Sequence, residues 1–120
     1  MQDCLFCMIA KGDIPSNKVY EDESVLAFRD INPQAPTHIL VIPKEHIADS
    51  ATHIQSVSEI NGENSSVVAH IFEVIAKIAA QEGLDEGFRV ITNSGKAAGQ
   101  TVPHLHFHIL AGTEMAEKLI

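Results

Sequence analysis

The sequence has little basic charge, little cysteine and no long apolar run, and each shortage excludes a class of protein. Eight Lys and Arg stand against 16 Asp and Glu, which gives a formal net charge of −8 with histidine neutral. A chain this acidic lacks the basic patch of a general nucleic-acid binder. No uncharged apolar stretch reaches the roughly 18 residues that a membrane span requires, and no basic segment marks a secretory signal at the N-terminus. We therefore expect a cytoplasmic protein with neither nucleic-acid nor membrane partners.

The two cysteines are too few for a disulfide scaffold, so the fold must rest on an apolar core. With 120 residues, 45% of them hydrophobic, the chain can bury such a core as a single domain spanning residues 1–120. Because the net charge is negative, the overall electrostatic field of the protein does not attract an anionic substrate. Any phosphate site must therefore be built locally, from backbone N–H groups and histidines.

Apolar periodicity and turn residues predict an α+β domain. A helical pattern of apolar residues runs from about residue 65 to 82, with polar residues on the other face and Gly83 placed to end the helix. The other expected elements are a short helix over 4–11, ended by Gly12, and strands over 19–21, 25–29, 38–42, 88–93 and 102–110. About five strands with one long helix and a short N-terminal helix indicate a mostly antiparallel sheet.

Three histidines alternate near the end of the chain, at His104, His106 and His108. In a strand, alternate side chains share one face, each about 7 Å from the next. The apolar residues between them would then face the long helix. Packing alone does not explain such a row, because each buried imidazole needs hydrogen-bond partners.

Two kinds of chemistry fit the row. A His-x-His strand with a third ligand could hold a catalytic metal. Alternatively, one imidazole could attack an electrophile while its neighbours fix its tautomer and protonate the leaving group. The preceding segment, residues 94–103, offers glycine backbone, an amide and a hydroxyl, and such a turn can point several N–H groups at an anion. A phosphate cradle beside the imidazoles favours the histidine nucleophile.

The segment over residues 100–108, Gln-Thr-Val-Pro-His-Leu-His-Phe-His, resembles the motif that names the histidine triad family. Residues 30–44 resemble the upstream segment of the same family, and residues 4–11, 14–15 and 26–30 also match. The resemblance covers the chain from Cys4 to about Gly112. It is most similar to the branch of nucleotide-binding proteins that cleave nucleoside phosphoramidates.

The resemblance implies a catalytic role for four histidines. His106 matches the nucleophile, which forms a covalent nucleotidyl-imidazole intermediate that water then hydrolyses. His108 matches a residue that binds phosphate or orients the nucleophile, and His38 lies where the family has a further histidine beside that network. His104 is the first histidine of the triad.

The resemblance also implies a nucleotide site. Asp30 matches the acid that binds both ribose hydroxyls, since a carboxylate can accept two O–H donors at once. Asn93, Gly99 and Thr101 match residues around the α-phosphate and leaving group, with threonine where the family usually has serine, and we include Gln100 and Val102 beside them. The pocket around the base matches apolar residues that would otherwise be assigned to the core, namely Leu5, Phe6, Ile9, Phe28, Ile31 and Leu40.

Cys4 and Cys7, in a C-x-x-C spacing, have three interpretations: a redox pair, a disulfide, or half of a zinc site. The resemblance implies structural zinc held by Cys4, Cys7, His46 and His104, a closed set with no open position. Zinc on His104 would prevent that residue from shuttling protons. His53 and His70 match no motif and are expected to be ordinary residues of the surface or a helix face.

The predicted function is that of a purine nucleoside phosphoramidase acting on a small nucleotide, with zinc and no organic cofactor. A dinucleoside polyphosphate hydrolase of the same family and a nucleotide-binding module with little catalysis are the alternatives. Some members carry an aromatic C-terminal tail on the leaving-group side, whereas this chain has no Trp. The long helix is apolar over a wide arc and strand 88–93 is a candidate sheet edge, so a homodimer is expected.

Overall fold

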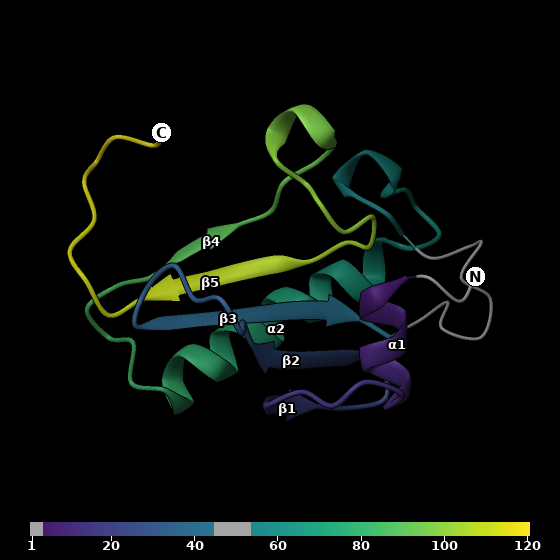
Figure 1. Ribbon diagram of the computed structural model, residues 1–120, viewed down its shortest axis with the longest axis horizontal. Helices are drawn as coiled ribbons and strands as arrows, with labels where there is room; N and C mark the ends of the chain where they lie inside the picture. Colours follow the sequence, from purple (N-terminus) through teal and green to yellow (C-terminus); the bar gives the residue numbers. More distant parts are fainter. Residues whose placement is uncertain (1–3, 45–53) are drawn as a thin grey trace.

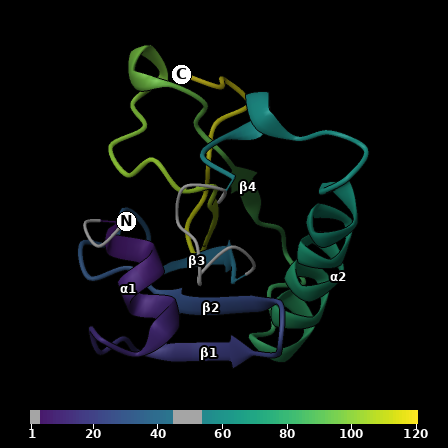
Figure 2. The same cartoon turned by 90° about the vertical axis from the view of Figure 1, so that its right-hand side faces the viewer.

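A computed structural model describes residues 4–44 and 54–120, which form an antiparallel sheet with one helix on each face (Figures 1 and 2). The sheet has five strands in the order β1-β2-β3-β5-β4. The elements are α1 (Leu5–Lys11), β1 (Lys18–Glu21), β2 (Val25–Arg29), β3 (Thr37–Pro43), η2 (Val57–Glu59), α2 (Ser65–Gln81), β4 (Arg89–Ile91), η3 (Lys96–Ala98) and β5 (Phe107–Ala111). The predicted α+β class with a mostly antiparallel sheet is confirmed.

Helix α1 is closed by side-chain and backbone groups at its two ends. The Cys4 sulfur accepts a hydrogen bond from the backbone N–H of Cys7, so the first cysteine caps the helix. At the other end Gly12 adopts φ +88°, a left-handed conformation that glycine reaches without cost, and its N–H bonds to the carbonyl of Ile9. The cap places both sulfurs at the buried start of the helix.

Alternation along β2 and β3 divides the core into two layers. Leu26, Phe28, Leu40 and Ile42 pack with α1, whereas the intervening residues pack against α2. Most of the apolar residues that the helical pattern selected in α2 are buried, namely Val67, Ile71, Val74, Ile75 and Ile78, whereas Phe72 of the same pattern is 48% exposed. Both faces of the central strands are thus covered, which explains their nearly continuous apolar sequence.

His70 lies on the half-exposed face of α2, as expected of a helix-face residue, but it also fastens the helix to the β1–β2 turn. Its Nε2 lies 2.7 Å from Oδ2 of Asp22, and the same oxygen accepts the hydroxyl of Tyr20 at 2.8 Å. The Asp22 carboxylate raises the pKa of His70, so the ion pair gains strength as the imidazole protonates. Asp22 therefore organises the turn and holds the helix over the sheet.

The last two strands are shorter than the sequence predicts, and backbone hydrogen bonds explain the difference. β4 covers Arg89–Ile91, not 88–93, and β5 begins at Phe107, not at residue 102. Before Phe107, the N–H of His104 bonds to the carbonyl of Val102 and the N–H of Leu105 bonds to the carbonyl of Ile54. These bonds draw residues 102–106 away from the sheet. As predicted, β4 lies at an edge.

Gly112 fixes where β3 begins. It has φ +95°, and a Cβ at this position would lie 2.9 Å from Cβ of Pro36. Only glycine lets the chain leave β5 this close to the loop that enters β3. The approach sets the position of Thr37 and hence of the next residue, His38. Within residues 4–44 and 54–120, no helix is both long and apolar enough to cross a bilayer.

Candidate active site

The histidines of β3 and β5 meet on the face of the sheet that α1 covers. Leu40 of β3 pairs with His108 of β5, and the side chain of Leu40 packs in the α1 layer. His108 therefore points the same way, and its ring centroid lies 5.1 Å from that of His38 and 5.1 Å from that of His106. The triad shares this face as the alternation predicts, although only His108 lies inside the strand.

A chain of hydrogen bonds fixes the tautomers of His38 and His108. The backbone N–H of Gln34 donates to Nδ1 of His38 at 3.0 Å, so Nδ1 carries no proton. In the neutral ring the proton is then on Nε2, which lies 2.8 Å from Nδ1 of His108 and donates to it. His108 must in turn carry its own proton on Nε2. A single backbone N–H thus makes His108 a hydrogen-bond donor toward the site.

His106 is held in the opposite tautomer. Its Nδ1 lies 2.7 Å from the carbonyl oxygen of His104, and because a carbonyl can only accept, Nδ1 carries the proton. The lone pair of the neutral ring is therefore on Nε2. The ring of Phe6 meets that of His106 edge to face, with centroids 5.0 Å apart, and fixes its tilt. This is the arrangement a nucleophilic imidazole requires.

Burial keeps these imidazoles neutral. Desolvation lowers the pKa of His38 and of His106 from the ordinary value. The pKa of His108 falls to about 4, first through desolvation and then through the two neighbouring imidazoles. Asp30 opposes these shifts, since its Oδ2 lies 3.5 Å from Nε2 of His38. At neutral pH the rings therefore present lone pairs and N–H donors, not positive charges.

His104 faces the two cysteines. Its Nδ1 lies 3.3 Å from Sγ of Cys4 and 3.4 Å from Sγ of Cys7, and all three residues are buried. Nε2 donates to the carbonyl of Pro43 at 3.1 Å, which leaves the Nδ1 lone pair directed at the sulfurs. Burial and the adjacent Cys4 thiol raise the pKa of the Cys7 thiol to about 12. Two thiolates here would need a cation, so the donor set fits a metal ion.

A second group of potential ligands, Asp30, His38 and His108, also has its donor atoms within 4.8 Å of one another. The hydrogen bonds oppose a metal there. Coordination through Nε2 of His38 would require the proton on its Nδ1, where the N–H of Gln34 already donates. The metal interpretation of the triad is thus disfavoured by the tautomers, whereas the cysteine pair with His104 remains compatible with zinc. The expected fourth ligand, His46, and also His53, lie outside the described residues.

The residues expected around the base are only partly brought together. Phe6, Ile9, Phe28 and Leu40 are buried in one cluster with both cysteines, and Val102 packs against it. Leu5 is 41% exposed and Ile31 is 92% exposed, so neither is buried in this cluster. The Asp30 carboxylate accepts the N–H of Asn32 at 2.8 Å with one oxygen. An exposed apolar side chain next to a half-buried carboxylate suits a site that closes on a nucleoside.

The loop before the triad is fastened by the side chain of Gln100, which the sequence assigned to nucleotide contact. Its Oε1 accepts the N–H of Gly95 at 2.8 Å, while Nε2 donates to the carbonyls of Gln55 and Val102. The amide is thus engaged at both ends within the loop. Asn93 lies half-buried just beyond β4. A cavity of about 650 Å³ opens beside the loop, and its lining includes Gly99, Gln100 and Thr101 together with Gln55, Ser56, Ser58 and Glu59.

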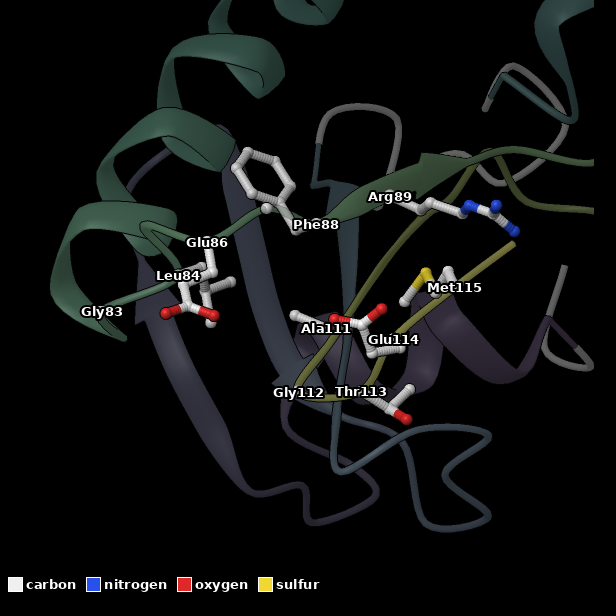
Figure 3. Close-up of a pocket in the computed structure, with 11 residues that line it drawn as sticks. Gly83, Leu84, Glu86, Phe88, Arg89, Ala111, Gly112, Thr113, Glu114 and Met115 are labelled. Atoms are coloured by element: carbon white, nitrogen blue, oxygen red, sulfur yellow. The ribbon is translucent and has the colours of Figure 1, made fainter. Parts of the chain in front are cut away.

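A further cavity, of about 750 Å³, lies apart from the histidines. Its walls come from residues 83–89, between α2 and β4, and from residues 111–115, which leave β5 (Figure 3). Glu86, Arg89 and Glu114 supply its charged groups, and among the described residues no cysteine or histidine lines it. The imidazoles and thiols that the structure describes thus lie elsewhere.

The sequence did not identify Gln34. Its contribution is a backbone N–H, which every residue but proline possesses, so no side-chain pattern marks the position. The turn that delivers it follows from Asn32-Pro33, and that dipeptide was the only available signal.

The sheet and the paired neutral imidazoles define a small α+β protein with a histidine-based site, and known proteins resemble the chain in sequence and in fold. Residues 11–115 match the HIT domain family. A purine nucleoside phosphoramidase of Escherichia coli is 40% identical over 119 residues, which make up 98% of this chain and 94% of that protein. A 14 kDa zinc-binding protein of Zea mays is 49% identical over 111 residues, 92% of this chain and 83% of that protein.

Solved structures agree. A HIT family hydrolase from Clostridium thermocellum superposes with a TM-score of 0.91 at 46% identity, covering 100% of this chain and 99% of that one. The chain belongs to the HIT, or histidine triad, family, as the resemblance of its motifs predicted.

The tautomers can be tested by long-range ¹H–¹⁵N NMR near neutral pH. We expect His106 to carry its proton on Nδ1, and His38 and His108 to carry theirs on Nε2. On acidification His108 should titrate at about 4, below the ordinary 6.5. Because the unfolded chain takes up this proton first, the free energy of unfolding should decline as pH falls between these two values. A proton on Nε2 of His106 in the free protein would contradict the assignment.

Proposed function

We propose that this protein is a purine nucleoside phosphoramidase, which hydrolyses the P–N bond of an adenosine 5′-phosphoramidate through a nucleotide bound covalently to His106. The observation that carries the proposal is the hydrogen bond from Nδ1 of His106 to the carbonyl of His104, because it leaves Nε2 as the attacking atom. The relatives named as a HIT family hydrolase and as a purine nucleoside phosphoramidase support a hydrolase with this substrate.

In the first step, Nε2 of His106 attacks phosphorus and the P–N bond breaks. The ring becomes cationic because Nδ1 keeps its proton, and the carbonyl of His104 stabilises that charge. The departing amine takes a proton from water, because a neutral His108 would become an imidazolate if it gave up its own; the Nε2–H of His108 instead donates a hydrogen bond to a phosphate oxygen. In the second step, water attacks phosphorus and the P–Nε2 bond breaks. The attacking water passes one proton to the hydroxide left by the first step, and the nucleotide leaves with His106 neutral again. Asp30 accepts the ribose hydroxyls with its carboxylate oxygens, one of which already accepts the N–H of Asn32.

Two other functions remain candidates. A dinucleoside polyphosphate hydrolase would use the same nucleophile, and turnover of diadenosine tetraphosphate compared with an adenosine phosphoramidate distinguishes it. A binding module with little catalysis would not need the tautomers described above. The opposed orientations of His106 and His108, one presenting a lone pair and the other an N–H, favour a catalyst over a binder.

We further propose that Cys4, Cys7 and His104, with His46, hold a structural zinc ion. When bound, zinc would link α1 to the chain just before β5 and would leave no coordination position for substrate. The thiols and the Nδ1 lone pair of His104 are the donor types that zinc prefers, and the zinc-binding relative from Zea mays supports this metal. His104 would then act through its carbonyl and not as a proton shuttle.

We also propose that the protein is a cytoplasmic homodimer joined at β4. This edge strand exposes Val90 and Ile91, which are 37% and 36% exposed, and the neighbouring Phe72 and Phe88 are 48% and 39% exposed. A short apolar edge of this kind can pair with a second copy and so continue the sheet.

Replacing the nucleophile gives the central test. His106→Asn should lower turnover of an adenosine phosphoramidate by more than about 1000-fold while nucleotide binding persists. The control is His70→Asn, because His70 contacts Asp22 of the β1–β2 turn and takes no part in the proposed reaction. This variant should keep turnover within about twofold. Denaturing quench of the wild type during turnover should trap a nucleotidyl adduct on His106, identified by mass spectrometry. Residual turnover of His106→Asn within about tenfold of wild type would refute the mechanism.

Zinc loss should affect stability and binding more than chemistry. Protein purified without chelator should contain about one zinc per chain, and Cys4→Ser or Cys7→Ser should lower both the zinc content and Tm. His70→Ala serves as the control and should keep its zinc. Because ligand thiols must be deprotonated, zinc affinity should fall in acid. Less than about 0.1 zinc per chain, with both thiols reacting freely, would contradict the site.

Sedimentation velocity tests the dimer. The wild type should sediment as a species of twice the 13.0 kDa chain mass at micromolar concentration. Ile91→Glu should shift it toward the monomer, because the carboxylate would be buried without a partner. Val57→Glu, at a residue 42% exposed on η2, should remain dimeric. A wild-type monomer under these conditions would exclude the interface.

A further inference from the structure

A side-chain hydroxyl holds the peptide of His106. Oγ1 of Thr92 donates to the carbonyl oxygen of His106 at 2.7 Å, and Thr92 is half-buried. The residue lies immediately after β4, whose last residue, Ile91, pairs with His108. The pairing of β4 with β5 therefore stops just before it would reach His106. Thr92 extends the contact between these two segments by one side chain.

The other described side-chain contacts of His106 hold its ring and not its peptide: Phe6 meets the imidazole edge to face, and the ring of His108 lies beside it. Upstream, the chain is tied elsewhere, because the N–H of Leu105 bonds to the carbonyl of Ile54. Downstream, β5 begins only at Phe107. The imidazole is fixed by the carbonyl of His104 at Nδ1, but that bond lies within the same short segment and moves with it. The hydroxyl of Thr92 is the described contact that joins the carbonyl of His106 to the segment immediately after β4.

We propose that Thr92 is a positioning residue for the nucleophile: its hydroxyl fixes the backbone of His106 so that Nε2 lies on the line of attack at phosphorus. The inference rests on the proposed function of His106. Thr92 contacts no reacting atom in this account and acts only through the peptide carbonyl. The requirement is strict, because a nucleophile displaced by about 1 Å can lose on the order of 100-fold in rate.

The hydroxyl and the methyl group of threonine can be separated by two substitutions. Thr92→Val keeps the shape and removes the hydroxyl, whereas Thr92→Ser keeps the hydroxyl and removes the methyl group. With an adenosine phosphoramidate, we expect Thr92→Val to lower kcat by about 10- to 100-fold with KM changed less than about threefold. Thr92→Ser should restore kcat to within about threefold of wild type. Thr113→Val, at an exposed threonine beyond β5, is the matched control and should leave kcat unchanged.

A purely structural role would give another pattern. If Thr92 contributed only to stability, Thr92→Val would lower Tm but keep kcat at temperatures where the protein is folded. Under single-turnover conditions, we expect the variant to form the nucleotidyl adduct on His106 more slowly while binding the product nucleotide with unchanged affinity. If Thr92→Val fails to fold, Thr92→Ala replaces it and is judged by the same criteria.

The results separate this inference from the proposed function. Full activity of Thr92→Val, equal losses in Thr92→Val and Thr92→Ser, or a rise in KM at constant kcat would each overturn the role of the hydroxyl. If His106→Asn is inactive in the same assay, the nucleophile stands and only the positioning role fails. If His106→Asn retains turnover, the proposed function itself fails, and the inference fails with it.

Discussion

The hydrogen bond from Nδ1 of His106 to the carbonyl oxygen of His104, 2.7 Å long, joins the two halves of the site. The carbonyl of His104 selects the tautomer of the predicted nucleophile. The imidazole of His104 itself faces both cysteine sulfurs through Nδ1 and donates to the carbonyl of Pro43 through Nε2. His104 therefore contacts the N-terminal helix, the end of β3 and the rest of the triad segment. A displacement of His104 would change its contacts with all three.

The site works against the net charge of its own protein. At −8, the chain repels an anionic nucleotide at long range, so attraction must arise locally. Among the described residues at the triad, no cluster of positive charge would serve the proposed substrate, because burial keeps His38, His106 and His108 neutral at physiological pH. In place of positive charges, the site presents the Nε2–H donor of His108 and the Nε2 lone pair of His106. Such an arrangement suits nucleophilic attack, since a protonated imidazole could not provide the electron pair.

Much of the fold follows from sequence pattern, and the misses have definite physical causes. The period of apolar residues located α2, and alternation located β2 and β3, because burial on one or two faces constrains residue type along the whole element. The limits of β4 and β5 did not follow, because the N–H groups of His104 and Leu105 bond to Val102 and Ile54, and backbone bonds leave no signature in residue type.

The site shows the same division between motif and geometry. The resemblance to the family predicted the histidines, Asp30 and the cysteine pair as site residues, and the structure brings Asp30, His38, His106 and His108 together and places His104 against both sulfurs. The resemblance assigned Gln100 to the nucleotide, whereas the amide is engaged with the loop backbone, and it gave no indication of Gln34 or Thr92. Gln34 donates through its backbone N–H, and the hydroxyl of Thr92 donates to a peptide carbonyl, so each contact involves a backbone group that a motif of side chains does not encode. Only three-dimensional contact distinguishes these two residues from ordinary loop residues.

The N–H of Gln34 gives the imidazole pair a direction. Two neutral imidazoles joined by one hydrogen bond could exchange roles, each as donor or as acceptor, with little difference in energy. A peptide N–H at one end removes that symmetry, because it cannot accept, and the polarity it imposes passes through His38 to His108. The backbone amide of residue 34 supplies this direction, whereas its side chain donates from Nε2 to the carbonyl of Asn32 at 3.2 Å and has no part in it. Scanning with alanine would leave this control untouched, whereas proline or a backbone ester at position 34 would remove it.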